Sequence, residues 1–116
     1  MARTETLFLL KARQDQWLRA NGLRGILSCL FTRSLHLINL AEKILGEIKA
    51  RKQVPASEWR TLMQKFGVTV SNYESCLGKL RAAGLVRREK GVYTLSSDFS
   101  RFLMQAAEIW HEWRAS

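Results

Sequence analysis

The side chains that could do metal or nucleophilic chemistry are too few and too far apart in this chain to act together. Cys29 and Cys76 have no second cysteine two residues away, so neither a zinc site nor a disulfide framework is indicated. His36 and His111 lack a cysteine, an aspartate or a second histidine at ligand spacing. We therefore expect no enzyme, no metal and no cofactor. The cysteines are interpreted as small buried hydrophobic residues, with a redox-sensing thiol as the alternative.

The charge of the chain indicates a polyanionic partner. Nineteen Lys and Arg outnumber ten Asp and Glu, which gives a formal net charge of +9. Such an excess suits DNA or RNA, and suits an anionic membrane surface less well. The apolar run over residues 25–31 stops at Arg33, well short of the ~20 residues that a membrane span needs. Because no signal peptide is visible either, we predict a cytoplasmic protein with no membrane partner.

Residues 62–86 carry the most informative local pattern, that of two short helices joined by a tight turn. Gly67 and Gly84 stand where a helix would end, because glycine readily adopts the left-handed conformation that closes helices. Ser71 and Glu74 have the S-x-x-E spacing of a capping box, which predicts a helix start at this point. The pattern predicts a helix-turn-helix, whose second helix can enter a major groove.

The remaining elements follow from hydrophobic periodicity and from caps. Helices are expected over residues 4–19, 26–52 with a break near 32–34, 58–66 with Ser57 as its cap, 72–83 and 99–114. Gly78, inside one of these helices, indicates close packing against a neighbour or a slight bend. Past Gly84 the period changes from helical to alternating, so residues 85–89 and 92–95 predict a hairpin around Lys90-Gly91.

The run from Leu62 to Leu95 resembles the winged helix-turn-helix of small bacterial and archaeal transcription regulators. The matching residues, which a basic hairpin follows, are Leu62, Gly67, Val68, Thr69, Ser71, Tyr73, Leu77, Leu80, Gly84, Leu85 and Val86. The resemblance implies a mostly α fold with a small β-hairpin, in a single domain over residues 1–116. It implies a winged helix core at 34–96, an N-terminal helical extension at 1–33 and an added C-terminal helix at 97–116.

The resemblance also implies a transcriptional regulator that binds double-stranded DNA through the helix-turn-helix (57–83) and a basic wing (85–95). The DNA-binding positions that it carries over to this chain are Thr69, Ser71, Asn72, Ser75, Lys79, Arg87, Arg88 and Lys90. Asn72 is the best base reader among them, because its amide can bond bidentately to adenine. The wing cations would approach the DNA backbone or the minor groove.

The expected reading helix departs from the usual pattern of such regulators in its charge. Its front half has no Arg or Lys, and Glu74 brings a negative charge close to the phosphates. The commonest specific contact, arginine to guanine, is therefore absent there. Two alternative functions stay open: a winged helix that serves protein–protein assembly, and a nonspecific architectural DNA binder.

The two helices outside the expected core carry large apolar side chains. We assign to a homodimer interface Leu7, Phe8, Leu10 and Trp17 of the first helix and Phe102, Ala106, Trp110 and Trp113 of the last one. A domain of this size has limited core surface to cover so many aromatic rings. Pairing across a two-fold axis would bury them and set the spacing between two reading helices. The alternative is that both helices wrap the same core.

Overall fold

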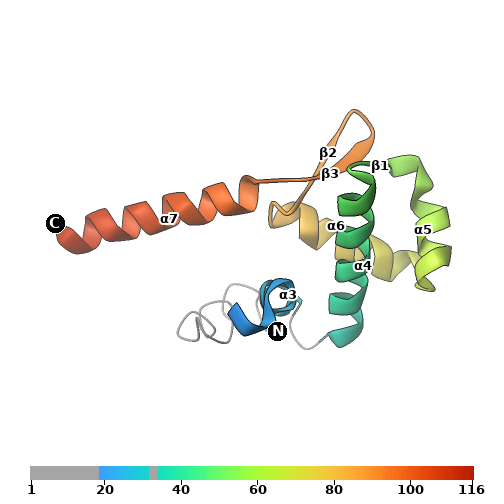
Figure 1. Ribbon diagram of the computed structural model, residues 1–116, viewed down its shortest axis with the longest axis horizontal. Helices are drawn as coiled ribbons and strands as arrows, with labels where there is room; N and C mark the ends of the chain where they lie inside the picture. Colours follow the sequence, from blue (N-terminus) through green and yellow to red (C-terminus); the bar gives the residue numbers. More distant parts are fainter. Residues whose placement is uncertain (1–18, 32–33) are drawn as a thin grey trace.

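A computed structural model of the chain describes residues 19–31 and 34–116. Its elements are α3 (Leu23–Leu30), α4 (Leu35–Arg51), β1 (Val54–Pro55), the 3₁₀ turn η1 (Ala56–Glu58), α5 (Trp59–Phe66), α6 (Val70–Ala82), β2 (Val86–Glu89), β3 (Val92–Leu95) and α7 (Asp98–Ala115). The three strands form one antiparallel sheet in the order β1-β3-β2. Figure 1 shows the helices gathered beside this small sheet, with α7 extending away from them. The predicted fold, a winged helix core with additional helices, is confirmed.

The core is built on the amphipathic helix α4. Its residues Ile38, Ala41, Ile44, Leu45 and Ile48 are buried, as their three- and four-residue spacing predicts. This face of α4 packs against α3, α6, β1 and β3. The other buried apolar side chains of the described residues come from these same elements and from α5 and β2. Helix α3 ends at Leu30 and α4 begins at Leu35, on either side of the expected break, of which residues 32–33 lie outside the described residues. Most of the helix expected over 4–19 also lies outside them.

Helix α6 starts two residues earlier than predicted, so the expected capping box is wrong. The N-cap is Thr69, whose Oγ accepts a hydrogen bond from the backbone N–H of Asn72 at 3.2 Å. Gly67 ends α5 with φ 67°, and the N–H of Val68 bonds the carbonyl of Met63 at 3.2 Å. This closure uses only two residues, so the chain re-enters helical conformation at Val70. Ser71 and Glu74 consequently lie within the helix, with exposed side chains.

The predicted cap Ser57 is also wrong, because a strand and a 3₁₀ turn occupy the place of a simple helix start. Ala56–Glu58 form η1, and no side chain caps the following helix α5. Before η1, Val54 and Pro55 form β1, a strand that the sequence patterns did not predict, with Val54 opposite Tyr93. Proline has no N–H to donate, so its place on an edge strand is the ordinary one.

The wing is a short hairpin with a two-residue turn. Lys90 and Gly91 have φ values of 53° and 78°, and positive φ at both positions is the signature of a type I′ turn.

The expected packing of Gly78 against a neighbour is wrong, because Gly78 is exposed and a Cβ built there meets no atom within 4 Å. Gly84 behaves differently. It has φ 84°, and a Cβ there would lie 2.9 Å from the backbone N of Phe99 at the start of α7.

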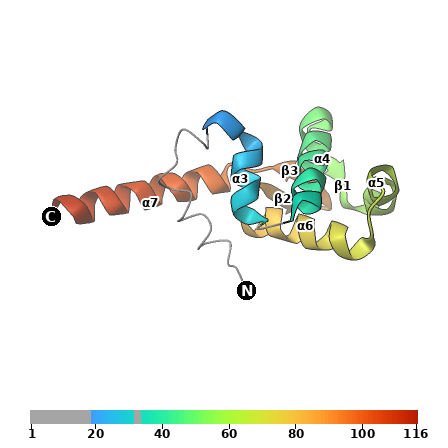
Figure 2. The same cartoon turned by 90° about the horizontal axis from the view of Figure 1, so that it is seen from below.

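Helix α7 has the extent that the sequence predicts and packs on almost nothing in the same chain. None of its residues is buried, and Figures 1 and 2 show it projecting from the body in both views. It does not wrap the core formed by the described residues.

Both cysteines are buried, as expected, and burial raises the pKa of Cys76 to about 12. A search of the described residues finds no helix with the length and apolar character needed to cross a membrane.

Candidate nucleic-acid interface

The surface that α6 presents to solvent consists of small, uncharged side chains. Its buried face carries Tyr73, Cys76, Leu77 and Leu80, which lie three and four residues apart. At 100° per residue, the opposite face is centred on Ser71, Ser75, Gly78 and Ala82, all of which are exposed. Ser71 and Ser75 are thus placed where a groove reader needs them. The face itself carries no charge, and its small side chains let another backbone or a base edge approach closely.

The flank of α6 that faces α3 contains two of the predicted DNA-binding residues. Lys79 Nζ donates to the carbonyl oxygen of Leu30 at 3.4 Å and lies 5.7 Å from the centre of the Phe31 ring. It therefore meets the C-terminal end of α3, where a cation complements the helix dipole. Asn72 is half-buried on the same side of α6. Thr69 accepts the N–H of Asn72 as the cap, which leaves its own O–H hydrogen to donate elsewhere.

The other flank of α6 faces the wing, and sequence reasoning missed its arginine. Arg81 lies seven residues after Glu74, on the same side of the helix. Its Cζ is 5.9 Å from the centre of the Tyr93 ring of β3. The spacing of Arg81 from Leu77, one helical turn away, would have placed it beside the buried face. Without the position of the wing, however, that spacing did not indicate what it contacts.

The two wing arginines lie on opposite faces of the hairpin. Arg88 pairs with Tyr93 in the strand register, and its Cζ lies 5.8 Å from the centre of that ring. Successive side chains of a strand alternate between faces, so Arg87 points the other way. Arg87 lies 3.9 Å from the carboxylate of Glu89. The hydrogen bond from Arg101 lowers the pKa of Asp98, and the charge of Arg87 makes a smaller contribution in the same direction. Only Arg88 faces α6, while Lys90 stands at the tip.

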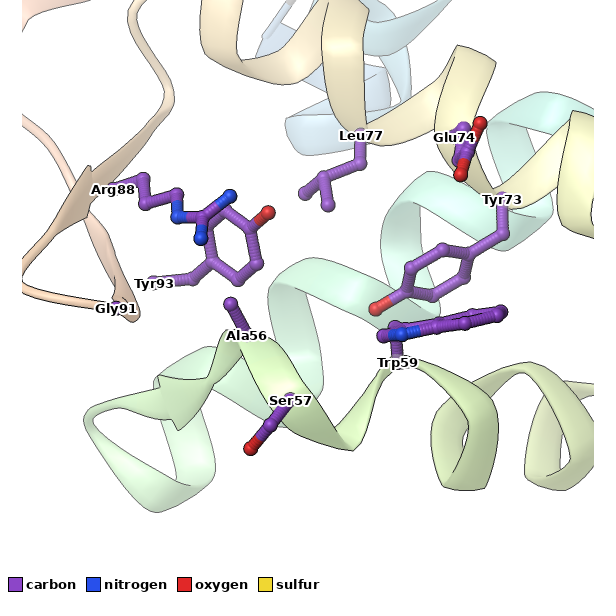
Figure 3. A pocket seen from close by; sticks show the side chains of 9 residues that line it. All are labelled: Ala56, Ser57, Trp59, Tyr73, Glu74, Leu77, Arg88, Gly91 and Tyr93. Atoms are coloured by element: carbon purple, nitrogen blue, oxygen red, sulfur yellow. The ribbon is translucent and has the colours of Figure 1, made fainter.

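A cavity of about 520 Å³ opens between η1, α5, α6 and the wing. It is lined by Ala56, Ser57, Trp59, Tyr73, Glu74, Leu77, Arg88, Gly91 and Tyr93. In Figure 3 the Tyr73 ring extends from α6 toward the Trp59 ring, and Arg88 lies beside Tyr93 on the wing side. Burial raises the pKa of Tyr73 to about 12, with smaller contributions from Tyr93 and Cys76. Tyr73 is therefore a neutral phenol at physiological pH.

A second concave surface lies on α7, away from the reading helix. Phe102, Gln105, Ala106, Ile109, Trp110 and Trp113 line an apolar groove of about 420 Å³. The rings of Trp110 and Trp113 stack with centroids 5.5 Å apart. The structure thus brings together the four α7 residues assigned to a dimer interface and adds Ile109, which sequence reasoning did not assign to it. The other four, Leu7, Phe8, Leu10 and Trp17, lie outside the described residues.

The geometry defines the class of protein as a winged helix-turn-helix protein with a projecting C-terminal helix. The family model that matches the chain is described as an archaeal family, and it covers residues 22–114. The chain therefore belongs to this archaeal family. No curated protein and no solved structure matches it.

Proposed function

We propose that this protein is a transcriptional regulator that binds double-stranded DNA as a homodimer. In this arrangement α6 enters the major groove and the wing follows the phosphate backbone or the minor groove. The observation that carries the proposal is the composition of the α6–wing surface. A small uncharged face on α6 is flanked by Lys79 on one side and, on the other, by Arg81, Arg88 and the single acidic residue Glu74. Small side chains allow close approach to base edges, while the flanking cations attract phosphates.

The distribution of charge assigns separate roles to the elements. Ser71 and Ser75 are placed to donate to base edges or phosphates from the centre of α6. Arg88 and Lys90 supply sequence-independent attraction from the wing, and Arg81 adds to it from α6. Affinity thus comes mainly from phosphate contacts, and direct base readout by α6 is modest.

A second candidate, a protein-assembly module, is favoured by the absence of Arg and Lys from the exposed centre of α6. The experiment that separates the candidates measures binding of the full chain to fragments of its own genome and to random duplexes, over a range of salt concentrations. Tighter binding to particular genomic fragments supports the regulator. Uniform binding supports an architectural DNA binder, and absent binding at low salt supports the assembly module.

The homodimer is proposed because α7 exposes its large apolar side chains. This helix has 18 residues and buries none of them, although most of the stability of helices in proteins comes from packing an amphipathic face. Phe102, Ile109 and Trp113 are 68%, 67% and 69% exposed. Together with Ala106 they recur at intervals of four, three and four residues, the spacing of a coiled-coil seam. A second α7 packed on this groove would bury the rings.

The charges of α7 favour an antiparallel pair. Its N-terminal half carries Arg101, which pairs with Asp98, and its C-terminal half carries Glu108 and Glu112 on the same flank as Arg101. An antiparallel arrangement brings each arginine near the acidic half of the other helix, whereas a parallel one places like charges together. The pairing would also satisfy the two-fold symmetry that a palindromic DNA site requires.

A further inference from the structure

The cavity between α5, α6 and the wing has the walls of a ligand site. Its volume of about 520 Å³ lies within the range of small-molecule sites. Three aromatic side chains line it, Trp59 of α5, Tyr73 of α6 and Tyr93 of β3. Tyr73 and Tyr93 are buried, whereas Trp59 is only partly buried, so the Trp59 ring is the one that can stack with a planar ligand. The cavity is open to solvent rather than enclosed, so a ligand has a route in.

Two opposite charges line the same cavity from different elements. Arg88 comes from β2 and Glu74 from α6. No acidic side chain of the described residues lies within ion-pair distance of Arg88, although its neighbour Arg87 is paired with Glu89. Glu74 has no structural task in the part of the chain that is described, because Thr69 caps α6 in its place. Both groups are therefore available to a ligand.

The surroundings of the cavity are basic. The guanidinium of Arg60 lies 5.0 Å from the centre of the Trp59 ring, and those of Arg81 and Arg88 lie within 6 Å of the Tyr93 ring centre. Of these three arginines only Arg88 lines the cavity, together with the carboxylate of Glu74, while Arg60 and Arg81 add positive charge around it. This balance favours an anionic ligand over a cationic one.

We propose that this cavity binds one nucleotide. The base stacks on the Trp59 ring, which is only partly buried, since every base has a flat face. Glu74 accepts a hydrogen bond from an exocyclic amino group of the base, and Arg88 holds the phosphate. The nucleotide is either free in solution or an unpaired nucleotide of a strand that lies along α6. Neither source is part of the duplex recognition proposed above, in which all bases remain paired.

The same site links a ligand to the DNA-binding surface. Glu74 belongs to α6, the proposed reading helix, and Arg88 belongs to the wing. A nucleotide held by both side chains occupies a cation of the wing that would otherwise meet a phosphate. Binding of a free nucleotide therefore lowers the affinity for duplex DNA. By linkage, duplex binding lowers the affinity for the nucleotide by the same factor.

The test follows the indole N–H signal of Trp59 in ¹⁵N-labelled full-length protein, assigned with the Trp59→Phe variant. AMP, adenosine, dTMP and inorganic phosphate are titrated separately. We expect AMP to shift the signal saturably and more strongly than adenosine or phosphate, because base and phosphate are both held. Arg88→Ala weakens AMP binding about tenfold or more, as loss of a charge-assisted hydrogen bond does. The matched control is Arg87→Ala on the opposite face of the same hairpin, which leaves AMP binding within twofold.

A second arm identifies the base contact and the source of the nucleotide. Glu74→Ala removes the preference for AMP over dTMP, because thymine has no exocyclic amino group. A DNA duplex with one unpaired adenosine is compared with the fully paired duplex. A larger Trp59 shift with the unpaired duplex assigns the site to a strand, and a shift with AMP alone assigns it to a free nucleotide. The proposal is overturned if neither ligand shifts Trp59, or if inorganic phosphate reproduces the AMP shift.

Discussion

At the scale of single residues, the tip of the wing holds a lysine in a conformation that costs energy. Lys90 has φ 53°, a region that side chains other than glycine and asparagine rarely adopt. Type I′ turns favour Asn-Gly, and the chain has Lys-Gly instead. Strained backbone of this kind concentrates at functional positions. The lysine places a positive charge at the tip of the hairpin, where a phosphate would lie.

Replacing Lys90 with asparagine should therefore separate stability from binding. Lys90→Asn is expected to raise the free energy of unfolding by up to about 1 kcal/mol, because asparagine tolerates positive φ. It should also weaken binding to every duplex and lower the salt slope by about one, as one phosphate contact is lost. Urea denaturation and salt-titrated binding measure the two effects. A variant that is both more stable and equally tight in binding would exclude Lys90 from the interface.

Two glycines should respond oppositely to alanine. Gly78 is exposed within α6, with open space around its missing Cβ, so Gly78→Ala is expected to stabilise the protein by about 0.5–1 kcal/mol. Gly84→Ala should destabilise it, since φ is 84° and the new Cβ would clash with the backbone at Phe99. Urea denaturation of both variants decides the point. A loss of stability in Gly78→Ala would mean that α6 is packed on that side.

At the scale of elements, the sequence predicts the long amphipathic helices and the hairpin because their patterns extend over many residues. Helix α4 is an example, with its buried residues three and four apart. Strand β1 was missed because two residues, one of them proline, carry no periodicity. The start of α6 was misplaced because Thr69 and Ser71 are equally good caps locally. The closure of α5 at Gly67 and Val68 decides between them.

The candidate site was predictable in its location and less so in its orientation. The wing arginines could be placed on a hairpin from sequence, but their separation onto two faces depends on strand register. Arg81 escaped notice because its partner Tyr93 lies on another element. Short-range patterns carry no information about such contacts. Glu74, assigned to a cap, instead lines the cavity.

The proposed dimer interface on α7 can be tested with charged substitutions. Ile109→Glu combined with Trp113→Glu should convert the dimer to a monomer of 13.4 kDa without unfolding the core, because α7 buries nothing in its own chain. Light scattering after gel filtration gives the mass, and circular dichroism checks the fold. The matched control is Met104→Glu, since Met104 is equally exposed but lies on the opposite side of α7. A monomeric wild type, or a dimer that persists in the double variant, would refute the interface.

At the scale of the whole molecule, the reading helix and the wing belong to one body. The N–H of Ala56 in η1 bonds the carbonyl of Gly91 at the wing tip at 2.8 Å, and β3 lies between β1 and β2 in the sheet. The hairpin is thereby fixed at its tip as well as at its base. Helix α7 leaves this body and gives the molecule a length of 52 Å against 31 and 26 Å in the other directions. The end that carries α6 and the wing thus suits DNA binding, and the end formed by α7 suits binding of a second copy of the chain.

Binding of the wing to DNA phosphates is tested by the salt dependence of duplex binding, measured for the wild type and for the Arg88→Ala/Lys90→Ala double variant. We expect the logarithm of the wild-type binding constant to fall linearly with the logarithm of the salt concentration. We expect the double variant to bind all duplexes more weakly, with a slope reduced by about two, because two phosphate contacts are lost. An unchanged slope and affinity in the double variant, or no duplex binding by the wild type at low salt, would contradict this role of the wing.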